Sequence, residues 1–408
     1  MTLLILTIVL IGIIAIETYI FKKVYAPPVV LGVVFLISFM LIQFAYGNLE
    51  NEYWFYACFI IAVIMFAIGF SIFNYKVTLS NKKLEYHIEF NDFYFLIFVV
   101  IAYIIAMYQI IDMVPLLLAS NINAWQTIRR EYSTSESISW LNLYISIFFL
   151  TLFTIYVIDN SKINKKNMLI SIPCLIPVLL CANRGTWFMF IISCAFIFIF
   201  TNRPKNSVVL RICLVTVLII ALLVIVSSIW KYKGYFSSNI EIMKNVSKLY
   251  FGSQFVAFRK RMTYSHNLNR GQNTFRFIIA LFNSLGITKM QPVNIVQPFI
   301  NIYGRWTNVY TGLSYYATDF GMWWAYIMEF IFGLIFGFLY KRVHESDEVH
   351  LFEIIMISML MYPLINQFFD DKFLSVTSQW LKYFIFVWIF TRKKIINISK
   401  KVEFENEK

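Results

Sequence analysis

Residues 2–20, TLLILTIVLIGIIAIETYI, decide the fold class of this chain. The run carries one charge, Glu17, and its length matches the ~20 residues that an α-helix needs to cross a hydrocarbon core of ~30 Å. Similar runs recur along the 408 residues, of which 60% are hydrophobic and 14% charged. Globular domains average about 45–50% apolar and 25% charged residues. The sequence therefore predicts an all-α polytopic membrane bundle, because unpaired backbone cannot face lipid.

Eleven segments have the length and apolarity of membrane spans. The first is expected to be retained, because it lacks the basic start and small-residue cleavage site of a signal peptide. The expected organisation is spans one to eight in residues 1–229, a long loop over 230–318, spans nine to eleven in 319–391 and a basic tail over 392–408. The expected spans are residues 2–20, 29–47, 53–73, 93–114, 138–158, 168–183, 186–201, 208–229, 319–340, 350–368 and 373–391.

Charge in the short connections predicts the orientation of the bundle. Every odd-numbered span is followed by lysine or arginine, from Lys22 and Lys23 after the first to Lys341 and Arg342 after the ninth. Positive charge is enriched in cytoplasmic loops, so the N-terminus is expected outside and the C-terminus inside. His87, His344 and His350 then fall in cytoplasmic connections, where we expect them to be solvated.

The long loop between the eighth and ninth spans is strongly basic and is expected to lie outside the cytoplasm. From Lys231 to Thr318 it holds eleven lysines and arginines and one acid, Glu241, in a chain whose net charge is +13. Two apolar stretches, 246–258 and 274–285, have the length of interfacial or re-entrant helices, and 293–303 is expected to be extended or broken. The loop is expected to pack onto the mouth of the bundle. The cationic connectors indicate an anionic partner; side chains that reach for lipid phosphates are the alternative.

Few side chains outside the membrane are suited to chemistry. Arg184 lies in CANRGTW (181–187), close to hydrocarbon, so it is expected to face a cavity or else to reach headgroups. His266 is a candidate general base or a surface histidine. Asp319 is a candidate cap of the ninth helix or a site carboxylate. The Glu50–Glu52 pair is a metal candidate or a solvated turn.

Other motifs exclude several classes of protein. The five cysteines lie in apolar runs without metal-ligand or paired spacing, so they are interpreted as small hydrophobes. The sequence contains no P-loop, no zinc motif and no nucleophile elbow. A basic surface outside the membrane does not indicate nucleic acid as a partner.

Two stretches resemble the Wzy-type polymerases of O-antigen and capsule repeat units. They are ANRGTWF (182–188) and YGRWTNVYTGLSYYATDFG (303–321), the second running into a span with Gly333 and Gly337. One dominant outer loop before the last three spans fits the same family. The resemblance implies a fold similar to membrane-embedded polyprenyl-phosphate glycosyltransferases of the GT-C kind.

The resemblance also implies a metal-independent transferase, without a cofactor, in the bacterial inner membrane with its site on the outer face. Its substrate would be an undecaprenyl-pyrophosphate-linked oligosaccharide, with membrane lipids, a chain-length regulator and a flippase as further partners. Arginines would stabilise the pyrophosphate leaving group, and a carboxylate or imidazole would deprotonate the acceptor. The predicted catalytic residues are Arg184, Arg305, His266 and Asp319; the pyrophosphate ligands are Arg184, Arg259, Arg261, Arg270 and Arg305; and the sugar-binding residues are Tyr264, Trp306, Asn308 and Tyr310.

Three alternatives remain at this stage. An O-antigen ligase would share the layout and differ in its acceptor. A transporter of lipid-linked oligosaccharides would show pseudo-symmetric halves and charges within spans. A metal-dependent glycosyltransferase would use the Glu50–Glu52 pair. For the aromatic residues, an interfacial belt is the alternative to sugar binding.

Overall fold

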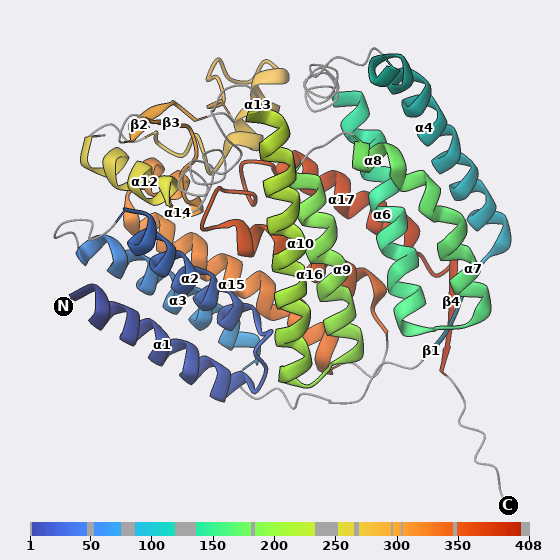
Figure 1. Ribbon diagram of the computed structural model, residues 1–408, viewed down its shortest axis with the longest axis horizontal. Helices are drawn as coiled ribbons and strands as arrows, with labels where there is room; N and C mark the ends of the chain where they lie inside the picture. Colours follow the sequence, from blue (N-terminus) through green and yellow to red (C-terminus); the bar gives the residue numbers. More distant parts are fainter. Residues whose placement is uncertain are drawn as a thin grey trace, which may run out of the picture. The chain divides into compact units, whose positions relative to one another are not determined.

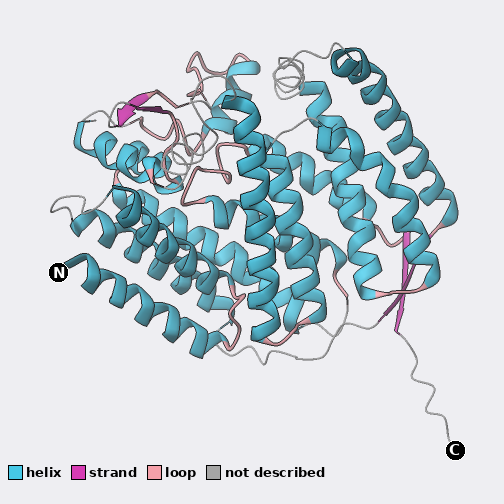
Figure 2. Ribbon diagram, in the orientation of Figure 1, coloured by secondary structure: helices cyan, strands magenta, loops and turns pink. Residues whose placement is uncertain are grey.

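The computed structural model describes residues 2–46, 53–74, 86–118, 136–180, 184–232, 252–264, 269–294, 297–302, 305–345 and 349–400, and most of them are helical (Figures 1 and 2). The longest helices are α1 (Thr2–Phe21), α2 (Pro27–Tyr46), α3 (Tyr53–Asn74), α4 (Asp92–Leu118), α6 (Glu136–Ile158), α9 (Arg184–Asn202), α10 (Asn206–Tyr232) and α15 (Met322–Glu345). The shorter ones are α7 (Lys162–Ser171), η1 (Ile172–Leu175), α8 (Ile176–Leu180), α12 (Ser253–Tyr264), α13 (Arg276–Ser284), α14 (Gly312–Phe320), α16 (Leu351–Asn366) and α17 (Thr377–Phe390).

The helical membrane class predicted from the sequence is confirmed. Among the described residues, seven helices are long and apolar enough to cross a membrane, and α2 and α16 contribute shorter apolar helices. Helices occupy all eleven predicted segments, although the sixth is divided into α7, η1 and α8. Pro173 and Pro177 explain this division, because proline removes a backbone donor and crowds the preceding turn.

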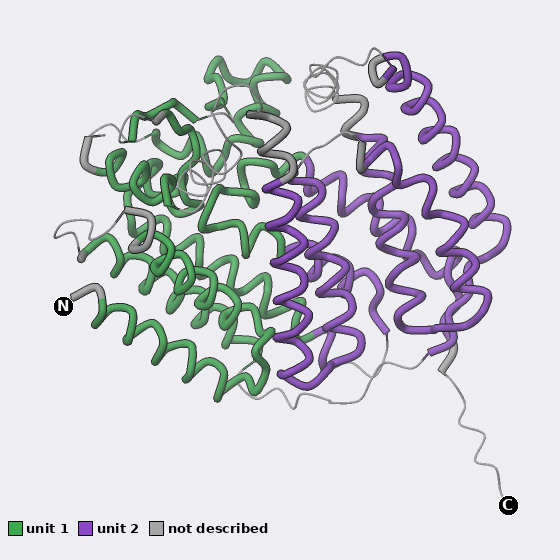
Figure 3. The backbone as a smooth tube through the Cα atoms, in the orientation of Figure 1, with its two compact units in different colours: residues 1–78, 228–341, 361–378 green, residues 79–227, 342–360, 379–408 purple. Residues whose placement is uncertain are grey.

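The chain forms two compact units, shown in Figure 3. Unit 1 comprises residues 1–78, 228–341 and 361–378, and unit 2 comprises 79–227, 342–360 and 379–408. The basic loop, α15 and the segment after α16 therefore belong to unit 1. The first eight predicted spans are shared between the two units.

Glycines let α3 and α15 approach closely within unit 1. A Cβ atom on Gly333 would lie 2.1 Å from the carbonyl oxygen of Phe66, and one on Gly69 would lie 2.2 Å from that of Phe330. Farther along both helices, the side-chain amide of Asn74 donates to the Gly337 carbonyl at 2.9 Å. The two helices run in the same direction, as expected for the third and ninth spans. Small residues at such contacts are typical of helix packing in membranes.

The basic loop packs onto the end of unit 1 where α3 and α15 begin, which we call the loop end. Phe255 and Phe258 of α12 contact Phe59 and Phe55 of α3, with ring centroids 5.1 and 5.4 Å apart. The predicted stretch 246–258 begins outside the described residues, and its C-terminal bound was wrong, because α12 (Ser253–Tyr264) continues through the basic residues that were interpreted as a connector. Arginine and lysine favour helices, whereas the prediction followed apolarity alone.

The rest of the loop follows the predicted order more closely. α13 lies within the predicted 274–285 helix. Strand β2 (Ile300–Ile302) pairs antiparallel with β3 (Arg305–Thr307), so the stretch expected to be extended forms one arm of a small hairpin. The ninth span begins later than predicted, because α14 ends at Phe320 and Gly321, at φ 87°, separates it from α15. Glycine adopts this left-handed backbone without strain.

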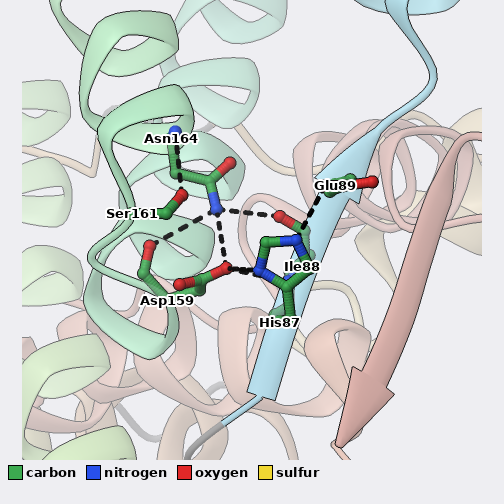
Figure 4. Close-up of polar contacts among 6 residues, drawn as sticks. All are labelled: His87, Ile88, Glu89, Asp159, Ser161 and Asn164. Carbon is green, nitrogen blue, oxygen red and sulfur yellow. Dashed lines mark hydrogen bonds and ion pairs between the residues drawn. The ribbon is translucent and has the colours of Figure 1, made fainter. Parts of the chain in front are cut away.

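Unit 2 contains a two-stranded sheet of β1 (Tyr86–Phe90) and β4 (Ile396–Lys400), which ties part of the predicted basic tail to the chain before α4. His87 lies in β1 and is 40% exposed (Figure 4). His344 was expected to be solvated, but it is buried against Phe200, with ring centroids 5.9 Å apart. This expectation was wrong because the residue lies in the last turn of α15 and not in the following loop.

Candidate functional site

Two consecutive tyrosines of α14 bind two consecutive aspartates at the loop end of unit 1. The Tyr315 hydroxyl donates to the Asp370 carboxylate, and the Tyr316 hydroxyl donates to Oδ1 of Asp371 at 2.7 Å. The Gly312 amide also donates to the Gln367 carbonyl, at 2.8 Å. These bonds join α14 to the segment that follows α16, so two regions predicted to lie on one side of the membrane do lie at one end of the unit.

Asp370 is the accessible carboxylate of this group. Its side chain is 19% exposed, and its Oδ2 lies 2.6 Å from the ammonium nitrogen of Lys372. Burial alone would lower the pKa of Lys372, but the adjacent Asp370 more than offsets burial and raises it. The lysine therefore remains a cation, and Asp370 is the anion that it neutralises.

Asp371 has a different environment from its neighbour. It is buried and accepts backbone hydrogen bonds from Phe373 and Ser375, both at 2.8 Å, in addition to that from Tyr316. Burial raises the pKa of Asp371 above its usual range, against the lowering effect of these three bonds. Because its acceptors are already engaged, the residue shapes the turn and positions Tyr316.

Arg261 of α12 supplies a cation that interacts electrostatically with Tyr315. Its Nη1 donates to Oε1 of Gln297 at 2.6 Å, and its guanidinium lies over the ring of Tyr310, 5.0 Å from the centroid. Burial lowers the pKa of Arg261, and the neighbouring Tyr310, Tyr315 and Asp319 counteract that shift. An anion bound here would be favoured, because it would compensate a charge that is poorly hydrated.

Tyr315 thus interacts with both an anion, Asp370, and a cation, Arg261. Burial raises its pKa well above the usual range, and Asp370 adds to the shift while Arg261 opposes it. The phenol is therefore neutral and acts as a donor. We call Arg261, Tyr315, Asp370 and Lys372 the Tyr315 cluster.

Asp319 does not cap the ninth helix, which was one of its two predicted roles. It lies near the end of α14, is 0% exposed and accepts from the amides of Asn273 and Thr274 at 3.1 and 2.6 Å. The side chains of the same two residues donate to it at 2.9 and 2.7 Å. Four donors fill its usual acceptor positions, so in this structure the carboxylate anchors the turn before α13 and is not open to a substrate.

Tyr310 was predicted to stack on a sugar, but its ring is 2% exposed and faces the guanidinium of Arg261. Its hydroxyl donates to the Pro298 carbonyl at 2.9 Å. The residue therefore supports Arg261 and the loop. Trp306, 63% exposed, has a ring that a sugar could reach, and Asn308 is partly exposed in the chain between β3 and α14.

The other predicted site residues are only partly described. Arg184 is the first residue of α9, in unit 2, and Arg305 the first of β3; Tyr264 ends α12, and the structure describes the side chains of none of these. His266 and the Glu50–Glu52 pair lie outside the described residues. Arg259 is partly exposed on α12. Arg270 is exposed before α13, with φ 48°.

No sequence pattern distinguishes Asp370 or Tyr315 from other polar residues near the membrane. The only signal was the Asp-Asp-Lys run at 370–372, in a connection predicted to lie outside. Its match to the Tyr-Tyr pair depends on contacts across 55 residues.

The fold and site define a polytopic helical membrane protein with a compact polar cluster over the end of its bundle. No protein-family model matches the chain, and no match was found among curated proteins or solved structures.

Proposed function

We propose that the protein polymerises undecaprenyl-pyrophosphate-linked oligosaccharide repeat units at the outer face of the bacterial inner membrane. It would transfer the growing glycan from one lipid carrier to the sugar of an incoming lipid-linked unit. The observation that supports this proposal is that Tyr315, which donates to the Asp370 carboxylate, also interacts electrostatically with the buried guanidinium of Arg261. A glycosyl transfer to a hydroxyl group needs a cation for the departing pyrophosphate and a carboxylate for the acceptor proton.

The proposed step balances without a further reactant. The bond between the anomeric carbon and the pyrophosphate oxygen breaks, and its electron pair stays on the pyrophosphate. The acceptor oxygen bonds to the anomeric carbon, and its proton passes to Asp370. Lys372 then moves from a carboxylate that has become neutral towards the new anion, which keeps the local charge balanced.

The arginines have graded roles in this proposal. Arg261 is poorly hydrated and held by Gln297, which suits it to a fixed pyrophosphate. Arg184, Arg259, Arg270 and Arg305 are proposed as further ligands because guanidinium groups bind phosphate oxygens in a bidentate manner. His266 remains a proposed second base.

The proposed membrane arrangement has eleven spans, with the N-terminus outside and the C-terminus inside, in a fold of the GT-C kind. The parallel α3 and α15 support this arrangement, because the third and ninth spans must cross in the same direction. The joining of α14 to the segment after α16 supports it as well.

Surface polysaccharide from cells that depend on this protein tests the proposal. Arg261→Ala, Arg184→Ala and Arg305→Ala should each abolish long chains while single repeat units still reach the surface. Lys260→Gln is the matched control, because it removes an adjacent α12 cation whose ammonium group is bound to the Asn301 carbonyl at 3.0 Å. Normal chain-length ladders from all three arginine variants would overturn the proposal.

The purified protein, supplied with the lipid-linked repeat unit, separates the remaining alternatives. Polymer formation in EDTA is expected, since no metal is required. Complete loss in EDTA would favour the metal-dependent alternative. Transfer only to a lipid-core acceptor, without growth of chains, would identify a ligase.

A further inference from the structure

Helix α13 carries an apolar stripe that no described part of the protein covers. None of its nine residues is buried. Ile278, Leu281 and Phe282 are 45, 43 and 43% exposed, and Leu285, the helix C-cap, is 63% exposed. Intervals of three and four residues place these side chains on one helical face.

The structure also gives the level of α13 relative to the membrane spans. The indole nitrogen of Trp324 donates to the hydroxyl of Thr274, just before α13, at 3.0 Å. Trp324 lies in the first turn of α15, whose span runs from Met322 to His344. Next to it, Trp323 is 81% exposed. Tryptophans at the end of a span are typical of the membrane–water interface, so α13 begins at that depth.

The side of α13 opposite the stripe is attached to the protein. Nε of Arg276 donates to the Val293 carbonyl at 2.7 Å, and its Nη1 donates to the Ser375 carbonyl at 3.4 Å. Arg276 lies two residues before Ile278, which is about 200° around the helix. One face is therefore fixed, and the apolar face is directed away from these contacts.

The charged residues of the segment that contains α13 are all positive. Residues 269–294 include Arg270, Arg276 and Lys289 and no acid. Arg270 and Lys289 are exposed on either side of the helix in sequence. An apolar stripe flanked by cations complements a lipid surface with negatively charged headgroups.

We propose that α13 lies in the plane of the bilayer at the loop end and inserts its stripe between the acyl chains of anionic phospholipids. Arg270 and Lys289 contact the headgroup phosphates. The same helix holds the turn that contains Asp371, because Ser375 binds both Arg276 and Asp371. Lipid contact thus stabilises the position of this turn. The proposal does not depend on the glycosyl transfer proposed above.

An environment-sensitive fluorophore on single introduced cysteines tests this proposal in nanodiscs. Phe282→Cys places the label on the stripe, and Ser284→Cys places it about 200° further around the same helix, also at an exposed position. The wild-type protein, with its five native cysteines, sets the background labelling. Lipids brominated near the headgroup end of their chains should quench the label at 282 at least twice as strongly as the label at 284. Equal quenching at both positions, or none at 282, would overturn the proposal.

A comparison of anionic and zwitterionic lipids tests separately whether Arg270 and Lys289 contact negatively charged headgroups. Quenching at 282 should be stronger in nanodiscs of phosphatidylglycerol than in phosphatidylcholine. Lys289→Gln in the Phe282→Cys background should reduce this difference by half or more, while quenching above the level at 284 persists. A label that is quenched identically in the two lipids would contradict the headgroup assignment.

Discussion

The hydroxyl of Tyr315 donates a hydrogen bond to the carboxylate of Asp370, which lies 55 positions later in the chain. The following residue in each segment makes the same kind of contact, because the Tyr316 hydroxyl donates to Asp371, also 55 positions later. Two adjacent pairs fix both the position and the rotation of α14 relative to the segment after α16. The first pair is partly accessible and the second is buried, so the arrangement combines a partly exposed carboxylate with a rigid support.

Asp370→Asn tests the proposed role of Asp370 as the base that takes the acceptor proton. The amide keeps the size of the side chain but cannot take a proton from an acceptor hydroxyl, so we expect polymer synthesis to fall by about 10²–10⁴-fold. The measurement is the rate of chain growth by purified protein with the lipid-linked repeat unit. Donor binding, followed with a non-reactive analogue, should change little.

Lys372→Gln is the companion of that variant. It removes the cation beside Asp370 and should weaken polymerisation less than Asp370→Asn does. Full activity in Asp370→Asn, with normal folding, would exclude the carboxylate as the base and direct attention to His266. It would leave the arginine experiments as the test of the transferase itself.

The sequence predicted the class and the order of elements better than the site. Apolar runs of about 20 residues mark helices because burial in lipid demands both length and apolarity. The same criterion misplaced α12, whose last turns contain Arg259 and Arg261. A charged run was interpreted as a connector, although such residues can continue a helix whose apolar side is already packed.

The site residues were harder to predict because their roles depend on distant partners. Asp319 was predicted to be a helix cap or an active-site carboxylate, whereas its acceptor positions are filled by Asn273 and Thr274, 46 and 45 residues away. Tyr310 was predicted to stack on a sugar, whereas its ring is buried and lies under the guanidinium of Arg261. Sequence identifies the residue types that chemistry needs, whereas burial and occupied lone pairs decide which of them are available.

Asp371→Asn is expected to destabilise the loop end. The Asp371 carboxylate accepts hydrogen bonds from Tyr316, Phe373 and Ser375. In Asp371→Asn, an NH2 group replaces one carboxylate oxygen and faces a hydrogen-bond donor in place of an acceptor. We expect a loss of about 2–3 kcal/mol in the free energy of unfolding. Thermal unfolding in detergent measures the loss. Tyr316→Phe, which leaves the backbone bonds intact, should cost less; an unchanged midpoint in Asp371→Asn would contradict this support role.

Gly333→Ala tests the close contact between α3 and α15. The added methyl group would lie 2.1 Å from the Phe66 carbonyl oxygen, so the helices must separate and lose the contacts around them. We expect a cost of about 1–3 kcal/mol, the usual range for overpacking. Gly12→Ala is the control, because a Cβ atom there has nothing within 4 Å. The two variants should differ in the temperature at which the purified protein aggregates.

His87 predicts a pH dependence at the sheet of unit 2. Its Nε2 lies 2.7 Å from Glu89 and its Nδ1 2.7 Å from Asp159, which also accepts from the Ile88 amide at 3.1 Å (Figure 4). The bond to Glu89 raises the pKa of His87 above 6.5; burial opposes the shift, and Asp159 adds to it. Because the folded-state pKa is the higher one, the stabilisation is complete below about pH 6.5 and is lost as the pH rises through the folded-state value. As the pH is raised from about 6 to 8, the unfolding temperature of the wild type should therefore decrease more than that of His87→Gln. Glu89→Gln should reduce the slope, and parallel pH profiles for wild type and His87→Gln would show that the imidazolium does not stabilise this sheet.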